Sequence, residues 1–253
     1  MSLHQTDWIV IPGGPGLSNE YLRFAFTQLI SINANLHFYN PYGSPESSGE
    51  THDLEALIDQ IPQVAYDKGL THYGLIAHSF GSYLALRALE RTGDDIDALI
   101  MLNPIPYQYH HWQQALINIQ QRIPQSVADR IAKLSEHTSI SSEFFKLILP
   151  YYTGIDNPTD LPSLTELPEI PLDMQACERI ASQVPNYDDK SILESINCPI
   201  AQIVGGKDPF FKDEHLLKDK TIVMPDLGHY PFLEDPNAFK QTFDKVEVML
   251  SRL

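Results

Sequence analysis

The sequence has few cysteines and contains no long apolar run. Only Cys177 and Cys198 occur, and neither lies in a metal-type C-x-x-C spacing. We expect two free thiols in a reducing compartment, with a single disulfide as the alternative. No stretch reaches the roughly 18 apolar residues of a membrane span, and the first residues lack the basic and apolar parts of a signal peptide. These absences predict a soluble, cytoplasmic protein.

Basic residues are also scarce, since 17 Lys and Arg face 33 Asp and Glu in 253 residues, giving a net charge of −16. Binding to nucleic acid needs clustered positive charge, so a nucleic-acid partner is excluded. The same charge disfavours anionic lipid surfaces and strongly anionic substrates. The expected partner is a small neutral or cationic molecule, and the sequence makes no prediction of oligomeric state.

Short apolar runs alternate with helical patterns over much of the chain, which is typical of a parallel sheet with crossover helices. The sequence therefore predicts an α/β fold with a mostly parallel sheet of about six strands and helices on both faces. The expected strands are residues 8–11, 36–39, 73–77, 98–102, 201–204 and 222–224, and the expected helices are residues 20–32, 53–68, 82–91 and 238–250.

This alternation stops between about residues 103 and 197. Helical periodicity continues there over residues 113–123, 127–134 and 143–149, and a proline-rich connection is expected over residues 157–172. We interpret residues 104–197 as a helical cap inserted into a core formed by residues 1–103 and 198–253.

The strongest local motif is Ala77-His78-Ser79-Phe80-Gly81, where an expected strand runs directly into a helix. A serine on such a turn adopts a strained backbone and exposes its hydroxyl, as a nucleophile requires. Small residues at positions 77 and 81 allow the strand and helix to pass closely. The alternative is a serine that only caps the helix.

Two later strands are each followed by a residue that could activate this serine. Asp208 follows Gly205-Gly206, and His229 follows the next strand. A serine needs a base to remove its proton, and the base needs a partner that fixes its tautomer. Since parallel strands end at one edge of a sheet, Ser79, Asp208 and His229 can meet there. Asp208 could instead stabilise a turn, and His229 could be structural.

Other acids compete with Asp208 for this role. Asp226 and Asp213 are the nearest candidates, but neither directly follows a strand-end Gly-Gly turn. The strand before the cap ends at Asn103 rather than at a carboxylate.

The loop Pro12-Gly13-Gly14-Pro15-Gly16 follows the first strand. Adjacent glycines let a backbone approach a ligand closely. One N–H group of this loop, together with that of Phe80, would stabilise the oxyanion of a tetrahedral intermediate. An ordinary turn is the alternative.

In this order, PGGPG, AHSFG, VGGKDP and GHYPFLEDP resemble the oxyanion loop, nucleophile elbow, acid turn and histidine loop of the α/β-hydrolase superfamily. The resemblance covers nearly the whole chain. It implies a serine hydrolase with Ser79 as nucleophile, Asp208 as acid and His229 as base, and with Gly14 and Phe80 as oxyanion donors through their N–H groups. It implies no cofactor. No metal site is expected either, because the adjacent His110 and His111 do not have the spacing of metal ligands on a helix.

Within the superfamily, PGGPG is most similar to the HGGPG of proline iminopeptidases, but Pro12 and Asn40 stand where those enzymes have histidine and aspartate. Three functions stay open. The chain could cleave a small ester or amide, act as an aminopeptidase of the proline iminopeptidase type, or be a non-enzymatic receptor for a small ligand. A substrate ammonium group could pair with a carboxylate of the cap, where the candidates are Glu166, Glu169 and Glu178. The favoured interpretation is that these three are solvated carboxylates.

Overall fold

A computed structural model describes residues 6–47, 53–137, 140–155, 166–212 and 217–250. Its main sheet has six parallel strands in the order β2-β1-β3-β4-β7-β8. This confirms the predicted α/β fold and its mostly parallel sheet. The strands are β1 (Asp7–Ile11), β2 (Asn35–Phe38), β3 (Tyr73–His78), β4 (Ile96–Leu102), β7 (Ile200–Gly205) and β8 (Thr221–Met224).

Side chains of the central strands alternate between two apolar layers, one on each face of the sheet. In β3, Leu75 and Ala77 join the layer that includes α2 and α3, whereas Ile76 joins the layer that includes α1 and α10. Every residue of β3 is buried, as expected for a strand covered on both faces. The covering helices are α1 (Glu20–Phe24), α2 (Leu54–Asp67), α3 (Phe80–Thr92) and α10 (Pro236–Leu250).

The helix expected over residues 20–32 is not a single α-helix. The α-helix α1 ends at Phe24, and a π-helical turn follows over Ala25–Leu29. The Ile30 N–H donates to the Ala25 carbonyl at 2.9 Å, which is the five-residue spacing of a π-helix. Periodicity predicted the buried face here but not this change of hydrogen-bond pattern.

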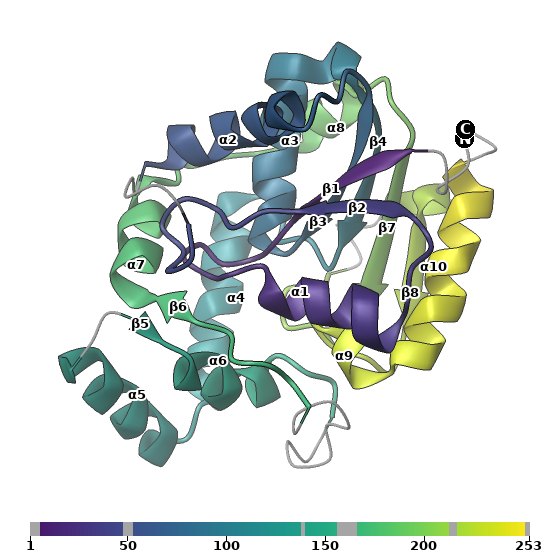
Figure 1. Ribbon diagram of the computed structural model, residues 1–253. Helices are drawn as coiled ribbons and strands as arrows, with labels where there is room; N and C mark the ends of the chain where they lie inside the picture. Colours follow the sequence, from purple (N-terminus) through teal and green to yellow (C-terminus); the bar gives the residue numbers. More distant parts are fainter. Residues whose placement is uncertain (1–5, 48–52, 138–139, 156–165, 213–216, 251–253) are drawn as a thin grey trace.

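In the segment between β4 and β7, α5, α6 and α7 lie to one side of the main sheet, whereas α8 lies against α3 (Figure 1). The expected helices of this segment are present as α4, α5 and α6, whereas α7, α8 and a small antiparallel sheet were not expected. The connection expected over residues 157–172 lies largely outside the described residues. The elements are α4 (Tyr109–Arg122), α5 (Gln125–His137), β5 (Ile140–Ser141), α6 (Glu143–Ile148), β6 (Leu172–Asp173), α7 (Met174–Gln183) and α8 (Lys190–Ser195).

Within the ranges that the structure describes, no helix combines the length and the apolar character that a membrane crossing requires.

Candidate active site

Ser79 sits on the turn between β3 and α3 in a left-handed backbone conformation, with φ of 54°. This conformation strains a residue that carries a side chain, as the motif predicts. The neighbouring loop passes very close, because a Cβ atom added to Gly81 would lie 2.5 Å from the Pro12 carbonyl oxygen. Only glycine fits at position 81, and the tight turn presents the Ser79 hydroxyl at the carboxyl edge of the sheet.

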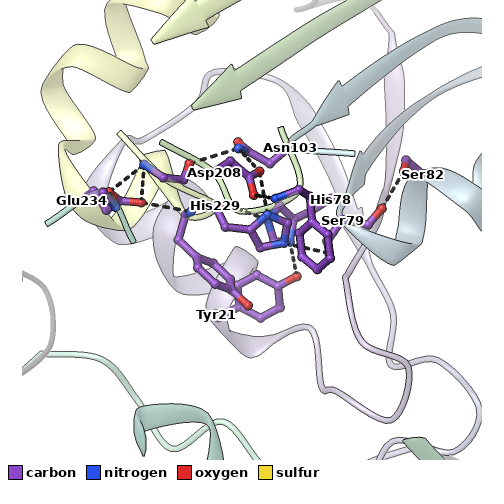
Figure 2. Close-up of polar contacts among 12 residues, drawn as sticks. Tyr21, His78, Ser79, Ser82, Asn103, Asp208, His229 and Glu234 are labelled. Carbon is purple, nitrogen blue, oxygen red and sulfur yellow. Dashed lines mark hydrogen bonds and ion pairs between the residues drawn. The ribbon is translucent and has the colours of Figure 1, made fainter. Parts of the chain in front are cut away.

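The structure brings Ser79, His229 and Asp208 together in one hydrogen-bonded chain (Figure 2). The Ser79 hydroxyl donates to His229 Nε2 over 2.8 Å, and His229 Nδ1–H donates to Asp208 Oδ2 over 2.8 Å. All three residues are buried, and His229 exposes only 1% of its surface. The three residues predicted from separate strand ends therefore lie in direct hydrogen-bonded contact.

Asp208 has two further donors that fix its carboxylate. Asn103 Nδ2 donates to Asp208 Oδ2 over 2.6 Å and to the Gly228 carbonyl over 3.0 Å. The Phe210 N–H donates to Asp208 Oδ1 over 2.8 Å. In the sequence, Asn103 was noted only because it stands where a carboxylate could have been. In the structure it is a hydrogen-bond partner of Asp208. The sequence signal for Asn103 was its position directly after an expected strand.

The competing acids do not enter this network. Asp226 is exposed, and Asp213 lies outside the described residues.

Glu234 anchors the loop that carries His229, and sequence reasoning missed it. Its carboxylate accepts the N–H groups of Gly228, Gly154 and Tyr230 at 2.8 to 3.1 Å. Burial raises the pKa of Glu234, and these three donors oppose that rise. The signal was present in GHYPFLEDP, where an acid five residues after the histidine lies in an otherwise apolar stretch.

The predicted oxyanion donors, Gly14 and Phe80, lie beside Ser79. Gly14 has φ of 126° and borders the same cavity as Ser79. A Cβ atom on Gly13 would lie 3.0 Å from Ser79 Cβ, so this loop packs directly on Ser79. Phe80 is the first residue of α3, where backbone N–H groups have no partner within the helix.

The two departures from the iminopeptidase pattern have structural roles here. Pro12 is buried against Gly81, as described above. Asn40 accepts the Asn19 N–H through Oδ1 at 3.0 Å, and so ties the loop after β2 to the start of α1.

A cavity of about 510 Å³ opens at Ser79 and extends between α4, α5 and α6. Among the described residues that line it, none is Asp, Glu, Lys or Arg. Glu166, Glu169 and Glu178 are exposed and do not border it. A cavity of this size can hold a small molecule, and its wall suits a neutral, apolar one. Apolar lining residues include Leu17, Ile105, Trp112, Ile119, Ile131, Phe145, Ile148 and Phe210.

In the part of the chain that the structure describes, no group of three or more His, Cys, Asp or Glu residues could hold a metal ion. Cys177 and Cys198 are free thiols.

Comparison with known proteins agrees with this fold. Residues 9–242 match the model of an alpha/beta hydrolase family. The chain belongs to the alpha/beta hydrolase family, and this membership supports a hydrolase. No curated protein matches the chain.

Solved structures of similar fold include peptidase-related proteins and esterases. A proline iminopeptidase-related protein of Thermus thermophilus has a TM-score of 0.72 at 19% identity, over 99% of this chain and 92% of that one. The proline iminopeptidase of Mycobacterium smegmatis has a TM-score of 0.67 at 17% identity, over 97% and 90%. An esterase of Exiguobacterium antarcticum has a TM-score of 0.67 at 15% identity, over 96% and 92%. At these identities the likeness concerns the fold.

Proposed function

We propose that the protein is a serine hydrolase that cleaves a small neutral ester by acyl transfer. Ser79 is the nucleophile, His229 the general base and Asp208 the acid that orients it. The single observation that carries this proposal is the chain from the Ser79 hydroxyl through His229 to Asp208, with both hydrogen bonds at 2.8 Å. Such a chain activates a hydroxyl that is otherwise a poor nucleophile.

The reaction takes place in two halves. Ser79 Oγ attacks the ester carbonyl while its proton passes to His229 Nε2, and the N–H groups of Gly14 and Phe80 stabilise the oxyanion. The intermediate then expels the alcohol, which takes the proton from His229 and leaves an acyl-serine. In the second half, water attacks the acyl-serine while His229 Nε2 accepts its proton. The second tetrahedral intermediate then expels Ser79 Oγ, which takes this proton back from His229 as the carboxylic acid is released.

The apolar wall of the cavity favours an ester over an N-terminal peptide. An aminopeptidase must pair the free ammonium group of its substrate, because an unpaired buried charge costs several kcal/mol. No described residue of the wall carries a carboxylate. Of the neutral and cationic substrates that the net charge allows, the neutral class therefore fits, and the proline-releasing activity is the weaker candidate.

The segment between β4 and β7 supplies much of the cavity wall, through Trp112 and Ile119 of α4, Ile131 of α5 and Phe145 of α6. We therefore propose that residues 104–197 are a cap over the core that carries the triad. The cytoplasmic location stays a prediction, in keeping with the free thiols.

The test compares a p-nitrophenyl ester with proline-aminomethylcoumarin, alongside labelling by a fluorophosphonate probe. We expect the ester to have the higher kcat/KM, and we expect Ser79→Ala to remove labelling and lower kcat by about 10³-fold or more. Ser195→Ala is the control, since Ser195 is exposed, its hydroxyl donates to the Ile192 carbonyl, and it does not line the cavity.

Three results would contradict the proposal in different ways. Labelling that persists in Ser79→Ala would refute the nucleophile. Faster, Ser79-dependent cleavage of the proline amide would favour the aminopeptidase. Tight binding of a small ligand without turnover of either substrate would favour a receptor.

A further inference from the structure

A buried chain of three hydrogen bonds connects three loops of the site that lie far apart in the sequence (Figure 2). The Gly13 N–H donates to Tyr21 Oη over 2.7 Å, and Tyr21 Oη lies 2.8 Å from His78 Nδ1. His78 Nε2 lies 3.0 Å from the carbonyl oxygen of His229. The chain thus runs from the loop that precedes Gly14 to the backbone of the proposed base.

The ends of this chain determine where its protons sit. A backbone N–H can only donate and a carbonyl can only accept. The Tyr21 hydroxyl therefore accepts from Gly13 and donates to His78 Nδ1, and His78 donates from Nε2 to His229. Burial and the nearby His229 hold the pKa of His78 well below its usual value, and burial raises the pKa of Tyr21. Both groups stay neutral, so this one arrangement of protons is stable.

We propose that Tyr21 and His78 are positioning residues that hold the oxyanion loop and His229 in register with Ser79. This inference is conditional on the proposed function. His78 directly precedes Ser79, so the chain fixes the donor loop and the base against the turn that carries the nucleophile. Neither residue borders the cavity, and each acts through a backbone group of another residue.

The expected effect follows from how strictly the reaction depends on geometry. Displacing a reacting group by about 1 Å can lower the rate by about 10²-fold. Loss of one link leaves the cavity wall intact, so substrate binding should change little. We therefore expect kcat to fall by about 10- to 100-fold while KM stays within about threefold.

Tyr21→Phe removes only the hydroxyl at the centre of the chain. Tyr187→Phe is the matched control, because Tyr187 is also buried and its hydroxyl donates to the Pro106 carbonyl at 2.8 Å, outside the chain. We expect the two variants to lower the urea midpoint by similar amounts, whereas only Tyr21→Phe lowers kcat and the rate of fluorophosphonate labelling.

Two substitutions of His78 separate its two bonds. In His78→Asn the amide oxygen can replace Nδ1 as the acceptor for Tyr21, whereas in His78→Gln the amide nitrogen can replace Nε2 as the donor to His229. We expect each to retain part of the kcat that His78→Leu loses. Combining Tyr21→Phe with His78→Leu should cost less than the product of the two single losses, because both break the same chain.

The outcomes separate this inference from the proposed function. If Ser79→Ala abolishes labelling but Tyr21→Phe keeps kcat within twofold of wild type, the positioning role is refuted and the serine mechanism stands. An equal loss of kcat in Tyr187→Phe, or independent losses in the double variant, would also refute it. Turnover that survives in Ser79→Ala would overturn both. If neither substrate is turned over, an unchanged labelling rate in Tyr21→Phe refutes the positioning role.

Discussion

Replacing Asp208 with asparagine removes one charge from the site and preserves the shape of the side chain. Asp208 Oδ2 accepts from His229 Nδ1 and Asn103 Nδ2, while Oδ1 accepts the Phe210 N–H. An asparagine has one oxygen and one NH₂ group, so in either orientation the NH₂ group faces a donor. If it faces His229, it also favours the tautomer whose Nε2 carries a proton and cannot accept the one from Ser79.

The magnitude follows from what the carboxylate does in the transition state. When His229 takes the proton it becomes an imidazolium, and the Asp208 charge stabilises it at 2.8 Å. Losing both that charge and the correct tautomer should lower kcat by about 10³- to 10⁴-fold. At about 1.4 kcal/mol per tenfold change, this is about 4 to 5.5 kcal/mol of transition-state stabilisation. The unpaired donor should also lower the free energy of unfolding by about 1–3 kcal/mol.

The assay measures kcat and KM for a p-nitrophenyl ester, with urea denaturation to show that each variant is folded. Asp226→Asn is the control, since Asp226 is exposed and lies outside the hydrogen-bonded chain. We expect it to behave as wild type. A folded Asp208→Asn variant with kcat within tenfold of wild type would refute the reasoning, and so would an equal loss in Asp226→Asn.

Three other buried groups give further tests. In Glu234→Gln only one side-chain oxygen remains to accept the three N–H groups. We expect urea denaturation to show a free energy of unfolding lower by about 1–3 kcal/mol, and an unchanged urea midpoint would contradict the anchoring role. Because the pKa of His78 is lowered in the fold, only the unfolded chain protonates this histidine readily below about pH 6.5. The free energy of unfolding should therefore decrease as the pH is lowered, by up to about 1.4 kcal/mol per pH unit. In His78→Gln this contribution to the pH dependence of unfolding, measured between about pH 7.5 and 5, should be absent. Burial raises the pKa of Cys177 to about 11, so mass spectrometry should show iodoacetamide reacting with it at pH 8 about 100-fold more slowly than with free cysteine.

The sequence predicted the features that local patterns determine. A buried parallel strand is a short apolar run bounded by turn residues, and this signal located all six strands of the main sheet to within a few residues. It also located Ser79, Asp208 and His229, because each follows such a strand and parallel strands end at one edge. Their catalytic roles remain proposals, whereas their proximity is an observed property of the fold.

Other parts of the site depend on contacts between distant segments, which leave little local signal. Asn103 and Asp208 are 105 positions apart, and Glu234 and Gly154 are 80 apart. Tyr21 shows the same difficulty. Its neighbours in the sequence have the pattern of an ordinary helix face, and the hydrogen bond of its hydroxyl to His78 forms only in the folded chain. The sequence places Asn103 after a strand and Glu234 in an apolar stretch, but it does not show which groups these side chains bind.

Substrate preference shows most clearly the difference between what local sequence patterns predict and what only the packed structure shows. The chemistry belongs to loops at strand ends, which local sequence identifies, but the cavity wall is assembled by packing α4, α5 and α6 against the core. From the sequence, the acids at 166, 169 and 178 could pair with a substrate ammonium group, although solvated surface carboxylates were the favoured interpretation. In the structure these acids are exposed, while Trp112, Ile131 and Phe145 face the cavity. The ester proposal therefore depends on helix packing, whereas the serine mechanism depends on motifs, and the two can fail independently.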